Sequence, residues 1–291
     1  KIVLLFLVLA LGLNSQIFAY DFSALINGDS IYFDITSTSP NTVSVTFHHW
    51  SYNSYSANIT IPDSVNYNGN YYRVTSIGNH AFRDCSNLTS VSLPNSITSI
   101  GNYAFYNCNA INSIVLPYSL TSIGSYAFSN CTNLKSTIFP ISMLTIGDYA
   151  FENCSAMTSL VIPDNVTSIG GFAFRGCANL NHLVLGRSIN TVGVDCFAGC
   201  NSIDTLFYNA INCSNYISDQ IVPSRVNARI VIMGDDVVSF PNKLLQSSPR
   251  LEYLKTGDSL TSISLQALDG CKNLERVIIG SSVTTIEGHA F

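Results

Sequence analysis

A 23-residue repeat constrains the fold of this chain more than any other feature. Five copies carry an Ile-Gly pair that is followed, two residues later, by Ala-Phe, and a sixth copy over residues 192–197 is looser. The five copies are residues 77–82, 100–105, 123–128, 146–151 and 169–174, and the cysteines that follow the copies are Cys85, Cys108, Cys131, Cys154, Cys177 and Cys200. Because one such unit cannot bury its own apolar face, this period predicts a stacked array of coils.

A single repeat predicts the course of one coil. Val91 and Leu93 alternate with serines, which is the period of a short strand, and Pro94 ends the strand because Pro lacks a ladder donor. A second extended stretch, residues 97–100, leads to Gly101, where we expect a sharp turn, and then to a single helical turn over 103–105 that is capped by Asn102. The chain is thus predicted to form an α/β solenoid of the leucine-rich-repeat type, with one parallel sheet and short helical turns. The inward positions are expected to be Ile97, Ile100, Ala104, Phe105, Cys108, Ile111, Ile114 and Leu116.

The repeat also carries a specific resemblance. The run Ile-Gly-x-Tyr-Ala-Phe-x-x-Cys-x-x-Leu-x-x-Val-x-Leu-Pro, as it appears over residues 100–117, resembles the BspA-type leucine-rich repeat. The resemblance covers residues 77–205 closely and 240–291 more loosely. It implies a right-handed superhelix and a protein of the kind found on the surface of, or secreted by, anaerobic bacteria and some parasitic protists. This repeat differs from the commonest leucine-rich repeats because a Pro follows the strand. The curvature of solenoids built from those commonest repeats is therefore not expected to apply to this chain.

Residues 1–19 have the features of a secretory signal peptide. An apolar run over residues 2–13 follows Lys1 and precedes a polar break and Ala19. At about 1.5 Å per helical residue this run is too short to cross a hydrocarbon core of roughly 30 Å. We therefore expect residues 1–19 to direct export, with a buried N-terminal helix as the alternative. No later stretch predicts a transmembrane span.

Two further regions follow the signal segment. Residues 20–76 lack the 23-residue period, and their β-branched and aromatic alternation together with the Asn68-Gly69 turn predicts a small N-terminal β cap. Residues 77–291 are predicted to form the solenoid. The step from Val192 to its counterpart Phe240 is longer than two repeats, so one coil, near residues 215–239, is expected to carry about two extra residues, with loops at 212–216 and 223–225. The chain stops partway through a coil, which suggests a truncated C-terminal end.

Composition excludes several classes of protein. The chain carries 18 acidic and 13 basic residues, and charged residues make up only 11% of the sequence. Nucleic-acid binding requires clustered Lys and Arg, so this sparse, mildly acidic set of charges argues against a nucleic-acid-binding protein. Intrinsic disorder is typical of chains with low hydrophobicity, so a hydrophobic content of 47% argues against a disordered chain.

Residues that carry chemistry are few. The six regularly spaced cysteines are expected to be buried free thiols, with disulfides between adjacent coils as the alternative and a metal site as a minor one. His48, His49 and Trp50 could bind a metal or a sugar, but adjacent strand residues point to opposite faces, so ordinary surface roles are favoured. No nucleophile elbow, zinc-protease or phosphate-loop motif occurs, so we expect neither an enzyme nor a cofactor.

The function predicted from these features is binding at the cell surface. The first interpretation is a secreted or cell-surface protein that binds extracellular proteins, including host matrix, or mediates adhesion to host or neighbouring cells. The second is a glycan-binding accessory protein of an anaerobic bacterium, encouraged by Trp50, Tyr52 and Tyr55. The outward-facing columns of the predicted sheet contain more apolar, aromatic and basic residues toward the C-terminus, which predicts an interaction site. The alternative is that β-branched residues occur there only because they favour strands. The predicted partner contacts are His182, Val184, Phe207, Tyr253, Lys255 and Arg276.

Overall fold

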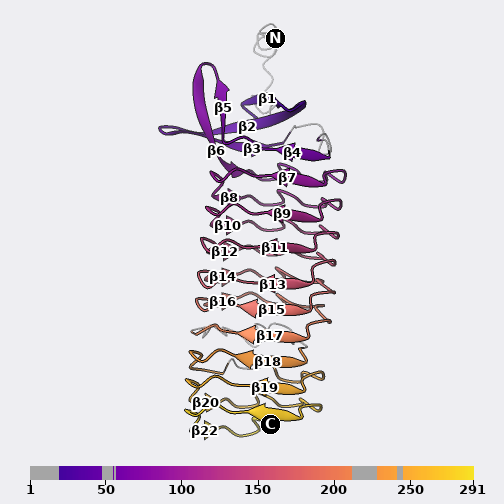
Figure 1. Cartoon of the computed structure of the whole chain (residues 1–291), viewed down its shortest axis with the longest axis vertical. Coiled ribbons are helices and arrows are strands. Elements are labelled where there is room, and N and C mark those ends of the chain that lie inside the picture. Colours follow the sequence, from indigo (N-terminus) through magenta and orange to yellow (C-terminus); the bar gives the residue numbers. More distant parts are fainter. Residues whose placement is uncertain (1–19, 48–54, 56, 212–227, 241–244) are drawn as a thin grey trace, which may run out of the picture.

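The computed structural model describes residues 20–47, 55, 57–211, 228–240 and 245–291. The predicted signal segment lies outside these residues, as do His48, His49, Trp50 and Tyr52. The chain winds into an elongated stack of coils with the cap at one end (Figure 1). Successive coils meet in parallel at the spacing of the repeat, as where Ser113 pairs with Ser136, which confirms the predicted solenoid.

Most coils contribute two strands rather than one. The longer strands, of three or four residues, stack along one face of the molecule. They are β4 (Asn58–Thr60), β7 (Ser90–Ser92), β9 (Ser113–Val115), β11 (Ser136–Ile138), β13 (Ser159–Val161), β15 (His182–Leu185), β17 (Thr205–Tyr208), β18 (Ile230–Met233), β19 (Tyr253–Lys255) and β21 (Arg276–Ile278). The prediction of a single parallel sheet with one strand per coil was therefore wrong.

The second set of strands comes from the stretch that precedes the Ile-Gly pair. These two-residue strands are β8 (Ser99–Ile100), β10 (Ser122–Ile123), β12 (Thr145–Ile146), β14 (Ser168–Ile169), β16 (Thr191–Val192), β20 (Ser262–Ile263) and β22 (Thr285–Ile286). Although short, they pair in register, so that Ile123 lies beside both Ile100 and Ile146. The array supplies the partners that make such short strands possible, which the sequence of one repeat could not indicate.

The continuity of the long-strand face changes along the axis of the solenoid. Pro94, Pro117, Pro140 and Pro163 follow the first repeat strands, and there the strands form separate sheets, β4–β7, β9–β11 and a third that begins at β13. β7 and β9 lie in contact without joining one sheet. Beyond Pro163 the position is taken by Gly186 and its successors, and the strands run in one continuous sheet through β21. Pro has no N–H to donate to a ladder, but the pairs β4–β7 and β9–β11 form although a Pro follows each strand, so Pro alone does not interrupt the face.

The predicted helical turns do not form, and the described residues contain no helix. Tyr103 has φ of 57° and Asn107 has φ of 60°, both in the left-handed region, which interrupts a right-handed helix. The N–H of Tyr103 donates to the carbonyl of Ser125 at 2.9 Å, and that of Phe105 donates to Ala127 at 2.7 Å. Backbone donors that a helix would use locally are thus used to join one coil to the next.

The core is a set of columns that run along the axis of the solenoid. All eight predicted inward positions are buried. Phenylalanine rings from successive coils stack with centroids 5.0–5.6 Å apart and nearly parallel planes, in the order Phe82, Phe105, Phe128, Phe151, Phe174 and Phe197. Each ring is covered by the rings of the neighbouring coils, so stacking buries an apolar surface that a single repeat would leave exposed.

The cap is built from strands β1 (Phe22–Ile26), β2 (Asp29–Thr38), β3 (Asn41–Thr46), β5 (Ser64–Tyr67) and β6 (Asn70–Ile77). β5 and β6 form the antiparallel hairpin predicted at Asn68-Gly69, both of which have positive φ. β6 then pairs in parallel with β8, so the cap sheet continues directly into the short-strand face. The first coil is therefore covered by β structure rather than left open to solvent.

Candidate interaction surface

The six predicted contact residues lie together on the outer side of the long-strand face. Parallel register aligns His182, Thr205, Ile230, Tyr253 and Arg276 in one column. The adjacent outward column is formed by Val184, Phe207, Ile232, Lys255 and Ile278. Because strand side chains alternate, both columns face away from the core. The structure thus brings together residues from four strands that are widely separated in sequence.

These side chains contact one another along the columns. The rings of His182 and Phe207 lie 5.4 Å apart and are tilted by 59°. The guanidinium of Arg276 lies 5.9 Å from the centroid of the Tyr253 ring, within the range of a cation–π contact. Lys255 and Arg276 are exposed, whereas the other four are half-buried. The surface therefore presents aromatic edges beside two exposed cationic groups.

Sequence reasoning missed two members of this surface, Ile230 and Ile232 on β18. The register step from Thr205 to Ile230 is longer than the regular step from His182 to Thr205, which places the expected insertion in this coil. The loops predicted at 212–216 and 223–225 lie outside the described residues. The long spacing between Val192 and Phe240 indicated that this coil contains extra residues. The sequence did not show where β18 lies within that spacing.

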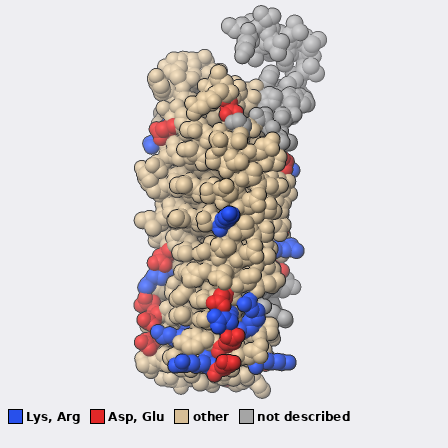
Figure 2. All heavy atoms as spheres, turned by 45° about the vertical axis from the view of Figure 1, so that its right-hand side comes forward, with Lys and Arg blue, Asp and Glu red and all other residues tan. Residues whose placement is uncertain are grey.

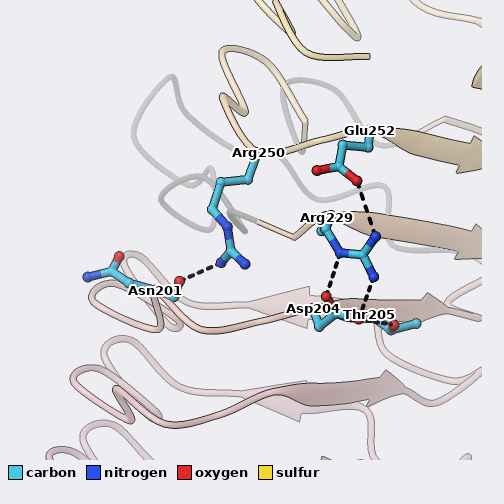
Figure 3. Close-up of polar contacts among 6 residues, drawn as sticks. All are labelled: Asn201, Asp204, Thr205, Arg229, Arg250 and Glu252. Atoms are coloured by element: carbon cyan, nitrogen blue, oxygen red, sulfur yellow. Dashed lines mark hydrogen bonds and ion pairs between the residues drawn. The ribbon is translucent and has the colours of Figure 1, made fainter. Parts of the chain in front are cut away.

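A row of charged side chains flanks the two columns (Figure 3). Arg229 lies between two carboxylates: its Nε donates to Asp204 Oδ1 at 2.6 Å, and its Nη1 donates to Glu252 Oε2 at 3.1 Å. The hydrogen bonds from Arg229 hold the pKa of Asp204 below its usual range. Arg250 donates to the carbonyl of Asn201 at 2.6 Å, which ties together coils on either side of the longer coil. The contacts of Arg229 and Arg250 join neighbouring coils. The basic residues of the two outward columns are Lys255 and Arg276.

Charge is distributed unevenly along the molecule. Figure 2 shows Lys, Arg, Asp and Glu gathered toward the C-terminal end of the visible face, while the middle and upper parts carry scattered charged side chains. The exposed apolar side chains of the long-strand face include Val115 at 83% and Ile138 at 84%. The long-strand face therefore has a sparsely charged N-terminal part, with Lys135 beside β11, and a mixed aromatic and charged C-terminal part.

A second aromatic column lies at the surface but offers no ring faces. His80, Tyr103, Tyr126, Tyr149 and Phe172 stack with centroids 4.5–5.1 Å apart. Each inner ring is covered on both faces by its neighbours, so it cannot stack on a sugar. Burial and the nearby Arg83 lower the pKa of His80, which favours the neutral imidazole. Tyr55, one of the residues that suggested glycan binding, is buried, and its hydroxyl donates to the Thr46 carbonyl.

The repeated cysteines lie inside the core as free thiols. The Sγ of Cys108 donates to the Phe82 carbonyl at 3.0 Å, and the same contact recurs in the following coils. Burial raises the pKa of the Cys85 and Cys131 thiols to about 12. Since the thiolate is the reactive and metal-binding form, these groups are poor nucleophiles. Within the described residues no three His, Cys, Asp or Glu side chains gather as metal ligands.

Comparison with known proteins places this architecture in a family. The model of the BspA type leucine rich repeat region matches residues 44–167, 75–204 and 208–291, in six copies. The chain belongs to the BspA-type leucine-rich repeat family. No curated protein matches the sequence.

Solved structures of bacterial leucine-rich repeat proteins share the fold. A leucine-rich repeat protein from Bacteroides ovatus is 26% identical, with a TM-score of 0.62 over 92% of this chain and 76% of that one. The pneumococcal vaccine antigen PcpA is 20% identical, with a TM-score of 0.56 over 91% of this chain and 71% of that one. A leucine rich cell surface protein from Faecalibacterium prausnitzii is 21% identical, with a TM-score of 0.53 over 91% and 94%. The last two likenesses show the fold alone.

Membership of the BspA-type family fits a binding scaffold better than a catalyst. Leucine-rich repeat proteins are in general non-catalytic and bind other proteins. In the part of the chain that the structure describes, no helix is long and apolar enough to span a bilayer. The exposed columns are therefore the features of this chain that call for a functional explanation.

Proposed function

We propose that this chain is a secreted or cell-surface protein that binds extracellular or cell-surface proteins through the C-terminal part of its long-strand face. The observation that carries the proposal is the gathering of Phe207, Tyr253 and Arg276 on one exposed sheet face. Aromatic side chains and Arg are the usual anchors of protein interfaces. Strand propensity explains outward Val and Ile but does not explain an Arg packed on a Tyr ring.

The location and the partner class have separate support. The apolar segment at residues 2–13 is the predicted export signal. One structural neighbour is described as a cell surface protein and another as a vaccine antigen, and such a location would suit adhesion to host or neighbouring cells. Tyr55 is buried, and the stacked aromatic column exposes no free ring faces, which favours a protein partner over a glycan.

A triple substitution tests the proposed surface. We expect Phe207→Ser, Tyr253→Ser and Arg276→Ser together to weaken binding to a captured extracellular-matrix or cell-surface protein at least about tenfold, because interface anchors carry most of the binding energy. The measurement is binding of residues 20–291 to an array of such proteins, followed by titration of each one bound.

The matched control changes one apolar, one aromatic and one Arg residue in the cap: Leu25→Ser, Tyr71→Ser and Arg73→Ser. All three residues are exposed, and they lie far from the C-terminal coils (Figure 1). The control variant should bind as the wild type does. Equal binding by wild type and the Phe207, Tyr253 and Arg276 variant, with both folded by circular dichroism, would contradict the proposal.

A further inference from the structure

The N-terminal part of the long-strand face carries two outward columns whose side chains differ in size. The first column is formed by the exposed serines of four successive coils, Ser90, Ser113, Ser136 and Ser159. The second column continues from Ser92 into the exposed and bulkier side chains of Val115, Ile138 and Val161. The serine column ends where Ser159 pairs with His182. The arrangement is therefore confined to β7, β9, β11 and β13, and it lies N-terminal to the surface proposed above.

The bulky column belongs to a larger exposed apolar area. Tyr118 and Ile141 follow the strands of the coils that hold Val115 and Ile138, and they are 70% and 80% exposed. Neighbouring apolar side chains that face solvent are typical of interaction sites. The serine column beside them is low, because a Ser side chain ends at its hydroxyl oxygen. This part of the face therefore combines a raised apolar row with a low polar row of the same direction.

Charge is placed at opposite edges of this area. The four strands and their flanks, residues 89–95, 112–118, 135–141 and 158–164, contain only two charged residues, Lys135 and Asp164. Lys135 directly precedes β11, whereas Asp164 follows β13 in the next coil, and both are exposed. Asp164 Oδ1 accepts from the N–H of Arg187 at 3.1 Å, but neither Lys135 nor Asp164 forms an ion pair within the described residues. One cation and one anion thus stand on opposite sides of the two columns.

A second copy of this chain matches both patterns. A two-fold axis that runs along the solenoid between the two columns turns one face onto another and exchanges the two edges of the strands. Each bulky column then lies over the serine column of the other copy. Lys135 reaches the edge that carries Asp164 of the other copy, one coil or about 4.8 Å away, which a flexible lysine stem can span. We infer that two copies form a parallel dimer through β7, β9, β11 and β13, with two Lys135–Asp164 pairs between the copies.

The size of the area sets the expected strength of the dimer. Four coils at about 4.8 Å, each with about seven residues at about 3.3 Å, cover roughly 450 Å² on each copy. Stable interfaces bury about 800 Å² per partner, so this contact belongs to the weak and reversible class. Beyond Ser159 the first column carries larger side chains, such as His182 and Tyr253, so the close packing ends before the surface proposed above.

Sedimentation velocity of residues 20–291 tests the inference. The weight-average mass of the wild type should rise from that of a monomer at about 1 µM toward that of a dimer at about 300 µM, as expected for a weak interface. Lys135→Glu alone would place two carboxylates at each pair, and Asp164→Lys alone would place two cations there. Because like charges repel across an interface, each single variant should dimerise at least about tenfold more weakly than the wild type.

Mixing the two single variants gives the sharpest result. In a dimer of one Lys135→Glu copy and one Asp164→Lys copy, both pairs again join opposite charges. The equimolar mixture should therefore regain dimerisation to within about threefold of the wild type, whereas neither variant does so alone. Only contact between copies explains such a recovery, because mixing changes nothing within either chain.

Matched controls reverse equivalent charges outside the proposed interface. Asp258→Lys removes an exposed carboxylate that accepts from the N–H of Ser281, just as Asp164 accepts from that of Arg187. Lys272→Glu reverses an exposed lysine of a C-terminal coil. Both control variants should dimerise as the wild type does.

A second pair of variants tests the apolar contact. Ile138→Ser/Ile141→Ser should dimerise at least about tenfold more weakly, because two exposed apolar side chains lose their contacts. Leu25→Ser removes an exposed apolar side chain from the cap and should have no effect. Thermal unfolding checks that both variants are folded. The triple variant of the surface proposed above should still dimerise while it loses its protein partner, so failure of the proposed function and failure of the dimer give different results.

Several outcomes would overturn the inference. A wild type that stays monomeric at the highest concentration would exclude a second copy, and binding of the apolar dye N-phenyl-1-naphthylamine to it but not to Ile138→Ser/Ile141→Ser would then assign the area to a small apolar ligand. A dimer that tolerates both charge reversals, or that does not return on mixing, would lack the Lys135–Asp164 pairs. Species heavier than a dimer would indicate a head-to-tail contact in place of the two-fold axis.

Discussion

At the scale of the residue, the repeated Cys acts as a small apolar side chain that also satisfies a backbone carbonyl. In five of the six repeated cysteines, all but Cys85, the Sγ lies 3.0–3.3 Å from the carbonyl of a Phe in the preceding coil, as in the pairs Cys108–Phe82 and Cys177–Phe151. Since all these side chains point into the core in one column, they do not face each other across a gap as disulfide partners do. Burial holds the pKa values of Cys108 and Cys154 above the usual range of a thiol.

Thiol titration checks this assignment. In a Cys213→Ser/Cys271→Ser variant, seven of the nine cysteines remain, and we expect no rapid reaction with 5,5′-dithiobis(2-nitrobenzoate) at about pH 8, because buried thiols stay protonated and covered. In guanidinium chloride without reductant, all seven should react. Five or fewer reactive thiols, restored to seven by a reductant, would reveal disulfides between adjacent coils.

At the scale of the element, interactions between coils decide the structure of each turn. Asn102 was expected to cap its own turn, but its Oδ1 accepts from the N–H of Ser125 in the next coil at 2.7 Å. Gly124 is the counterpart, one repeat later, of Gly101, where a sharp turn was expected, yet the φ of Gly124 is not in the left-handed region. A Cβ on Gly124 would lie 2.7 Å from the backbone nitrogen of Asn102, so close approach between coils is what requires glycine. The sequence predicts local motifs well, but these partners exist only in the assembled array.

Replacing Gly124 by Ala should therefore destabilise the array. The added Cβ meets backbone of the adjacent coil, which cannot move aside as a side chain could, and such overpacking costs about 1–3 kcal/mol. Urea unfolding measures the change in the free energy of unfolding. Gly171→Ala is the matched control, since its Cβ would first meet a Val194 methyl at 3.3 Å. Equal losses in the two variants would argue against close approach as the cause.

At the scale of the whole molecule, the repeat period predicted the stack, its inward columns and the register that unites the six contact residues. The sequence predicted a second extended stretch at residues 97–100, but not that such stretches pair as a second set of strands, because their partners lie in the neighbouring coils. It also missed Ile230 and Ile232, because the position of the extra residues within the longer coil depends on pairing with β17.

A stacked array should transmit a core defect to its neighbours before the ends. Phe128 stacks on Phe105 at 5.0 Å and on Phe151 at 5.1 Å, so Phe128→Ala should cost about 3–5 kcal/mol. Hydrogen exchange should quicken most in residues 100–150, with the cap affected least, because each coil contacts only its neighbours.

The control for this change is Ile138→Ala, which alters a side chain that is 84% exposed and should shift the unfolding free energy by no more than about 0.5 kcal/mol. Unchanged exchange in residues 100–150, or equal quickening along the whole chain, would contradict nearest-neighbour stability.

Successive coils are joined by the same backbone hydrogen bonds, and this has a consequence for the gain and loss of repeats in the gene. The N–H of Tyr103 donates to the carbonyl of Ser125 just as that of Tyr126 donates to the carbonyl of Asp148, so each coil offers its successor the same donors that its predecessor offers to it. In-frame duplication or loss of one repeat by recombination would therefore leave every remaining pairing intact. The exposed faces would lengthen or shorten in steps of about 4.8 Å, while point mutations alter single outward columns. Populations can in this way vary the reach of the surface and its chemistry independently.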